Sequence, residues 1–181
     1  GTGNADTIRN NAISNSNAEG KGILIYSPYK SAVIRENTIL NVDEGILNAG
    51  QSDINIPVFT GNYIDGQNRA GSRGVVQTIK RTGMDNSAVN GIFENNFIKN
   101  NGSGFYVECD SGSANNITAH DNFISGNTKG VELVNNNLLV NDFSCNWWGT
   151  AAHVDTAVYS GVSYIPFLTD SSDAENDSAG F

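Results

Sequence analysis

The sequence predicts an all-β fold, a right-handed parallel β-helix of about six coils with a C-terminal capping segment. Three observations lead to this prediction. One asparagine recurs almost regularly along the chain, apolar residues stand at fixed distances from it, and Gly or Asn occupies the positions where each repeat must turn. The chain also contains 27 Asn and 20 Gly, so long helices are not expected.

The repeat is about 25 residues long, and its reference column is a series of asparagines. Steps of 26, 25, 34, 26 and 24 residues separate Asn11, Asn37, Asn62, Asn96, Asn122 and Asn146. Three residues earlier, the chain is apolar in every coil: Ile8, Ile34, Phe59, Phe93, Ala119 and Phe143. Two residues later, it is apolar again: Ile13, Ile39, Ile64, Ile98, Ile124 and Trp148. Stacked coils would bury both columns at a rise of about 4.8 Å, and the Asn amides would bond to one another along the stack.

The remaining elements of each coil follow from the same alignment. Residues that tolerate a left-handed backbone stand four positions after the Asn and predict a turn: Asn15, Asn41, Gly66, Asn100 and Gly126. Strand-like triplets follow a glycine at residues 46–48, 105–107 and 131–133, and a third apolar segment closes the coil at residues 32–34, 58–59, 89–93, 117–119 and 138–143. Each coil therefore holds three short strands. A β-sandwich is the alternative, but it does not require one repeated Asn-to-Gly spacing.

Length and composition suit one domain, with a β-helix over residues 1–169 that includes a cap at about 143–169. Residues 170–181 are acidic and have little to bury, so a disordered tail is expected there. Trp147 and Trp148 are expected to cover the last coil, with a sugar-stacking role as the alternative. The first residues offer no obvious cap, which suggests that the chain belongs to a larger parent protein.

Charge and hydropathy limit the partners of the chain. The 19 acidic and 10 basic residues give a net charge of −9, which opposes binding to nucleic acid. Membrane insertion is not expected, since no apolar run approaches the roughly 20 residues that a span needs. Cys109 and Cys145 are either two buried thiols or one disulfide, and the sequence does not decide between them.

Two columns are expected on the outer surface. The first column consists of the residues that directly follow the repeated asparagines: Ala12, Thr38, Tyr63, Phe97, Phe123 and Trp147. This aromatic series is either a sugar-binding platform or a stack that stabilises itself. The second column lies on the strands that follow the glycines and consists of Leu24, Leu47, Val76, Tyr106 and Glu132. That apolar stripe is expected to be covered by a partner, a polysaccharide or a loop of the same chain.

The third coil is irregular, with 34 residues and four of the ten basic side chains: Arg69, Arg73, Lys80 and Arg81. Function in repeat proteins often lies on such insertions. Lys80 aligns with Asp110 of the next coil, and Glu108 and Glu132 are expected nearby on the same face. The cluster is either a chemical site or a ladder of surface ion pairs.

The columns resemble those of a known family, the right-handed parallel β-helix proteins of the pectate-lyase-like superfamily. The resemblance covers roughly residues 7–168 and rests on triplets such as Asn37-Thr38-Ile39 and Asn96-Phe97-Ile98. The segment 145–149, followed by 162–168, is similar to the closing segment of many bacterial surface β-helix proteins. Because the superfamily includes lyases, hydrolases, epimerases, adhesins and phage tailspikes, the motifs are specific for the fold and only weakly informative about activity.

Two functional hypotheses follow, and the first is preferred. In the first, the chain is a non-catalytic extracellular or cell-surface module, either a scaffold or a polysaccharide-contacting domain. No particular cofactor is required, although Ca²⁺ is an option, and the substrate-binding residues are Tyr63, Phe97, Phe123, Tyr106 and Arg73. Alternatively, the resemblance implies the C-terminal part of a Ca²⁺-dependent lyase or epimerase acting on acidic polysaccharide. Lys80 or Arg81 would then be the base, and the metal ligands would be Glu108, Asp110 and Glu132.

Overall fold

The protein is an all-β parallel solenoid. The computed structural model describes residues 6–15, 20–26, 31–50, 55–79, 88–109, 114–134, 138–149 and 162–170. Within these ranges there are sixteen strands and no helix. It follows that no helix in the described part is suited to crossing a membrane.

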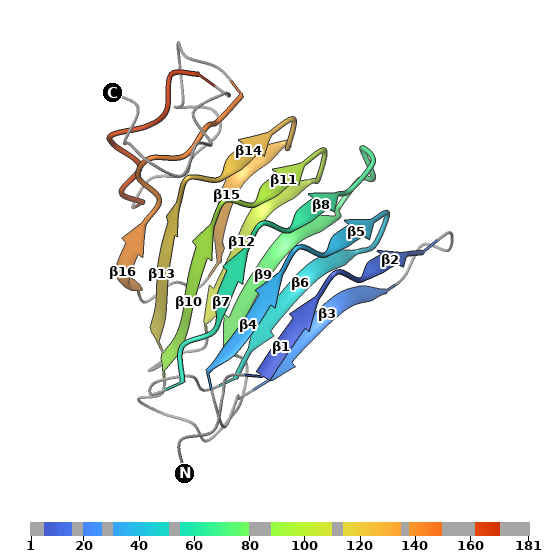
Figure 1. The fold of residues 1–181 in the computed structure, drawn as a ribbon. Coiled ribbons are helices and arrows are strands. Elements are labelled where there is room, and N and C mark those ends of the chain that lie inside the picture. Colours follow the sequence, from blue (N-terminus) through green and yellow to red (C-terminus); the bar gives the residue numbers. More distant parts are fainter. Residues whose placement is uncertain are drawn as a thin grey trace.

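The strands form three parallel sheets, and each coil contributes one strand to each sheet (Figure 1). The first sheet contains β1 (Asp6–Arg9), β4 (Ala32–Arg35), β7 (Val58–Thr60), β10 (Ala88–Glu94), β13 (Ala114–His120) and β16 (Leu138–Asp142). The second contains β2 (Ala12–Ser14), β5 (Thr38–Leu40), β8 (Tyr63–Asp65), β11 (Phe97–Lys99) and β14 (Phe123–Ser125). The third contains β3 (Lys21–Tyr26), β6 (Glu44–Ala49), β9 (Arg73–Ile79), β12 (Ser103–Cys109) and β15 (Lys129–Val134).

The predicted fold class is confirmed, with a small difference in the number of coils. The described strands make five complete coils of three strands, and β16 begins a sixth, where the sequence predicted about six coils. The pairing register follows the predicted columns. Ile34 pairs with Phe59 in the first sheet and Ile39 pairs with Ile64 in the second.

The asparagine column forms a continuous hydrogen-bonded ladder. From Asn11 to Asn146, each Nδ2 donates to the Oδ1 of the Asn in the next coil at 2.9 Å in all five steps. The backbone N–H of each donor Asn bonds to the same oxygen at 2.9–3.1 Å. From Asn37 onward, Nδ2 also donates to a backbone carbonyl of the preceding coil at 2.7–3.0 Å. The ladder therefore satisfies buried amides that would otherwise be costly.

The two apolar columns beside the ladder form the core. The rings of Phe59 and Phe93 stack with centroids 4.5 Å apart and an angle of 6°. The next position in this column is the small Ala119, which is fully buried. The ring of Phe105 comes in from the third sheet, with its centroid 5.2 Å from that of Phe93 and 5.0 Å from that of Phe143. The small residue in the column is thus matched by a large one from the facing sheet.

The turns agree only in part with the sequence. The predicted left-handed backbone occurs at Asn41, Asn100 and Gly126, but in the third coil it falls at Gln67 and Asn68 and not at Gly66. A second left-handed column, which the sequence analysis missed, lies directly before the ladder, with φ between 55° and 63°: Asn10, Glu36, Gly61, Asn95, Asp121 and Cys145. Glu and Cys do not signal this conformation, because their side chains disfavour it.

The segment 162–168 covers the C-terminal end of the stack. Its backbone bonds to the last coil through Phe143 N to Ser163 O at 2.7 Å and Leu168 N to Asn146 O at 3.0 Å. Val162 and Leu168 are buried there, and Trp148 is 4% exposed. Residues 150–161 of the expected cap and 171–181 of the expected tail lie outside the described residues.

Candidate binding site

The irregular third coil carries an ordered loop at the corner between the second and third sheets. This insertion loop, residues 66–72, joins β8 to β9. Ser72 donates from its backbone N and its Oγ to the carbonyl of Arg69 at 3.2 and 2.8 Å, and Asn68 N donates to Asn100 O at 2.9 Å. A Cβ on Gly102 would lie 3.0 Å from Gly71 N, so the loop packs closely against the turn of the next coil. Local bonds therefore fix the loop in place.

A pocket of about 480 Å³ lies beside the insertion loop and extends over the corners of the next two coils. Its described lining combines loop, turn and strand residues: Asn68, Arg69, Ala70, Gly71, Asn101, Gly102, Ser103, Gly126, Thr128, Lys129 and Glu132. The volume falls within the range of small-molecule sites in proteins. The exposed polar side chains of the lining, such as Asn68 and Thr128, offer hydrogen-bonding groups to a ligand.

Glu132 is the only carboxylate among the described lining residues. It accepts hydrogen bonds from Ser103 Oγ and from Lys129 Nζ. Burial raises the pKa of Glu132, but the bonds from Lys129 and Ser103 and the charges of Lys129 and Arg73 outweigh this effect. The pKa therefore lies below the ordinary value, and the carboxylate stays ionised.

The pocket also contains the guanidinium group of Arg69. Arg69 forms an ion pair with Asp43 through Nη2 at 2.5 Å. Its Nη1 is buried and has no hydrogen-bond partner among the described residues. Because Nη1 is closed to solvent, the guanidinium contributes to this corner through its ion pair with Asp43.

The outward column of the third sheet has the predicted register, but part of it is buried and not open to solvent. Leu24, Leu47, Val76, Tyr106 and Glu132 are successive partners across the five strands. Tyr106 is only 8% exposed, and the guanidinium carbon of Arg73 lies 3.7 Å above its ring centroid. Arg73 also approaches Glu44 at 3.6 Å. The structure thus brings Tyr106 and Arg73 together, with the arginine over one face of the ring.

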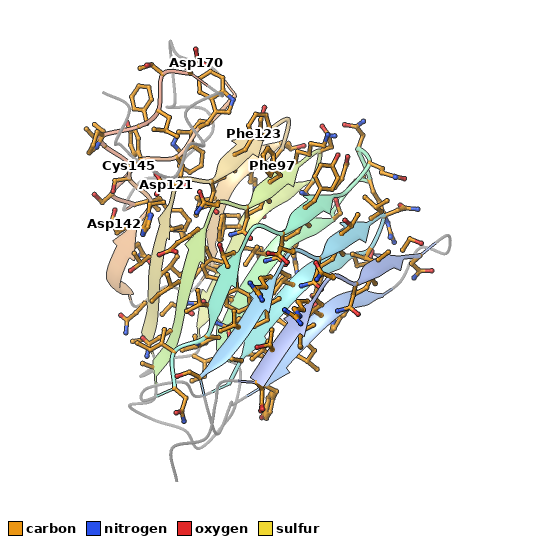
Figure 2. All side chains as sticks on the ribbon, viewed as in Figure 1. Phe97, Asp121, Phe123, Asp142, Cys145 and Asp170 are labelled. Carbon is orange, nitrogen blue, oxygen red and sulfur yellow. The ribbon has the colours of Figure 1, made fainter. Side chains whose placement is uncertain are left out.

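The aromatic column of the second sheet is also in the predicted register, and Figure 2 shows Phe97 and Phe123 on neighbouring coils. Their centroids are 5.5 Å apart in a stacked arrangement, whereas Tyr63 and Phe97 are 6.4 Å apart and tilted by 32°. Lys99 Nζ lies 4.9 Å from the Tyr63 centroid. Phe97 is 40% exposed. Since the stacked rings turn faces toward each other, they offer fewer free faces to a sugar.

The residues of the alternative lyase hypothesis are only partly described. Lys80, Arg81 and Asp110 lie outside the described residues. Glu108 is 9% exposed and accepts a hydrogen bond from Tyr106 at 3.2 Å. The register pairs Glu108 with Val134, two positions beyond Glu132. Among the described residues, no group of three or more His, Cys, Asp or Glu is placed to hold a metal ion.

Two further reactive residues lie near the C-terminal end. His120 contacts Asp121 through Nδ1 at 2.8 Å and Glu94 through Nε2 at 3.3 Å. Cys145 is a free thiol. Burial raises the pKa of the Cys145 thiol, and the negative charges of Asp121 and Asp142 raise it further. A hydrogen bond with Ser144 lowers it, but by less. The thiol is therefore protonated near neutral pH and is a weak nucleophile.

The irregular coil, Arg69 and Glu132 could be singled out from the sequence, whereas pocket side chains such as Thr128 and Lys129 could not. One signal was present. Asn101 and Asn127 are 26 residues apart and form a second, short ladder, with Nδ2 to Oδ1 at 3.0 Å. Ser103 and Lys129 also occupy one column, directly before the glycines. No protein-family model, curated protein or solved structure matches this chain.

Proposed function

We propose that the chain is a non-catalytic β-helix module of an extracellular or cell-surface protein, and that it holds a carbohydrate in the pocket beside the insertion loop. The observation that carries this proposal is the pocket itself, about 480 Å³ in volume and with a mixed polar and apolar lining. The resemblance of the repeat and of the closing segment to the pectate-lyase-like superfamily and to bacterial surface β-helix proteins supports the proposed location.

The chemistry of the lining suits a polyhydroxylated ligand. Thr128 and Lys129 supply donors, Glu132 supplies acceptors, and Asn68 can do both. A sugar presents alternating hydroxyl donors and acceptors, so such a mixed lining matches it better than an apolar pocket would. The fixed loop and the stacked coils also hold these groups in position, which reduces the entropy lost on binding.

The state of Glu132 supports binding without cleavage. Glycosidic hydrolysis requires a carboxylic acid that is protonated near neutral pH and a second carboxylate on the other side of the bond. Glu132 is the single carboxylate of the described lining, and its pKa is lowered. The proposal therefore assigns Glu132 to ligand binding. The aromatic column is assigned to stabilisation of the stack, because its rings contact one another.

The proposal is tested by calorimetric titration of the chain with a panel of neutral and acidic trisaccharides. Reducing ends and the ultraviolet absorbance of unsaturated products are followed in the same samples. Saturable binding without product supports the proposal. Product formation would show an enzyme, and the absence of binding across the panel would refute carbohydrate recognition.

A matched pair of variants locates the site. Thr128 is exposed and lines the pocket, and a longer apolar side chain in T128M should obstruct it. Thr38 is also exposed but lies outside the described pocket lining, on β5, so T38M is the control. We expect T128M to lose binding and T38M to retain it. Equal binding by both variants would place the ligand elsewhere.

A further inference from the structure

We infer that the pocket recognises an uncharged saccharide and discriminates against uronates and sulfated sugars. This inference rests on the proposed carbohydrate-binding function and specifies its ligand class. It is carried by the arrangement of charges around the pocket.

The cations at this corner are already paired with carboxylates of the chain. Arg69 contacts Asp43 at 2.5 Å, and Lys129 contacts Glu132. Arg73, beside the pocket, lies 3.6 Å from Glu44 and above the Tyr106 ring. An anionic sugar would therefore have to displace an existing partner before it could form an ion pair.

The carboxylate of Glu132 adds a direct barrier to an anion. Because its charge is held by Lys129 and Ser103, it remains ionised at neutral pH and would face a uronate or sulfate with like charge. Hydroxyl groups behave in the opposite way. Oε1 and Oε2 each use one lone pair, for Lys129 and Ser103 respectively, so each can accept a further charge-assisted hydrogen bond from a sugar hydroxyl.

The net charge of the chain also agrees with a neutral ligand. At −9 it disfavours the approach of a polyanion at long range. Binding should accordingly depend on hydrogen bonds and only weakly on ionic strength.

The test compares neutral trisaccharides with an acidic one on the full chain. Cellotriose, mannotriose, maltotriose and β-1,4-galactotriose are titrated beside trigalacturonate, each at low and moderate salt. We expect at least one neutral sugar to bind about tenfold more tightly than trigalacturonate, which is a difference of about 1.4 kcal/mol. Its affinity should change less than about twofold with salt, because no ion pair forms with the ligand.

The outcomes separate the inference from the function on which it rests. Binding of trigalacturonate alone would refute the inference and leave carbohydrate binding intact. Binding of neither class would refute both.

Variants at two matched carboxylates test the mechanism. E132Q keeps the size of the side chain and removes its charge, so the preference for neutral over acidic sugar should fall about tenfold. E94Q is the control, since Glu94 is a half-buried carboxylate that contacts His120 on the first sheet and is not among the described lining residues. If E132Q does not fold, K129Q provides the second test. That variant leaves Glu132 without its cation, so rejection of trigalacturonate should become stronger. An unchanged preference in a folded E132Q or K129Q would overturn the inference.

Discussion

Replacing Asn96 by Ala should show how much one rung of the asparagine ladder stabilises the fold. Asn96 is 1% exposed, and its side chain has five hydrogen-bonding contacts of 2.9–3.0 Å, three of which share the two protons of Nδ2. Oδ1 accepts from the backbone and side-chain nitrogens of Asn62, and Nδ2 donates to Asn122 Oδ1 and to the carbonyls of Phe59 and Glu94. Oδ1 accepts two bonds and Nδ2 has two protons to donate. At about 1 kcal/mol net for each, less the side-chain entropy that Ala does not lose, the cost should be about 2–4 kcal/mol.

The control is the end of the same ladder. Among the described residues, the Asn11 side chain donates only to Arg9 O and Asn37 Oδ1, and it is exposed, so N11A should cost about 1 kcal/mol or less. Both variants are compared with the native chain by equilibrium urea unfolding, followed by far-ultraviolet circular dichroism. Equal losses of stability in N96A and N11A would contradict the explanation of the ladder as a set of buried, mutually satisfied amides.

Three further predictions concern backbone strain, coil spacing and pH. E36N should raise the free energy of unfolding by about 0.5–1 kcal/mol, because Glu36 has φ of 55° and Asn tolerates this conformation. E36A, which keeps the strain, should show no gain in the same urea titration. G74A should lower the unfolding free energy by about 1–3 kcal/mol, since its Cβ would lie 2.5 Å from Ile98 Cγ2 and 2.8 Å from Gly104 O. A thermal midpoint equal to that of the native chain would refute the close packing of coils there. The pKa of Glu132 is lowered in the folded chain, so its ionised form should stabilise the fold fully at pH values above the ordinary Glu pKa of about 4.3. This stabilisation should be lost as pH falls from there through the lowered folded pKa. The urea midpoint of E132Q should therefore fall less than that of the native chain between neutral and acidic pH, and parallel losses would argue against it.

The fold could be predicted because stacking converts a linear spacing into contact in space. Once Asn37 and Asn62 are neighbours, the apolar residues at fixed distances from them must also be neighbours, and Ile39 lies beside Ile64. The same reasoning gave the correct register for the outward pair Phe97 and Phe123. Each of these statements depends on the period of the repeat and not on the detailed packing.

The features that the sequence did not reveal depend on local geometry. Glu36 and Cys145 adopt a left-handed backbone because the turn before the ladder requires it in every coil, although their residue types disfavour it. Tyr106 is on the predicted outward column, but it is buried and Arg73 lies over its ring, which cannot be read from the spacing. The side-chain conformation of Arg73, and not its position, decides whether the ring is free.

The location of the pocket follows from the same logic, whereas its specificity does not. In a regular solenoid each coil covers the equivalent positions of its neighbour, so a concave site needs a break in the repeat. The insertion loop supplies this break next to the corners that carry Ser103 and Lys129. The position of the break can be seen in the 34-residue step, but the pairing of Glu132 with both residues appears only when the strands are in register. Charge balance at the pocket therefore depends on four adjacent coils, from Asp43, which pairs with Arg69, to Lys129 and Glu132. Substitutions that preserve each repeat can still change the class of ligand that the pocket accepts.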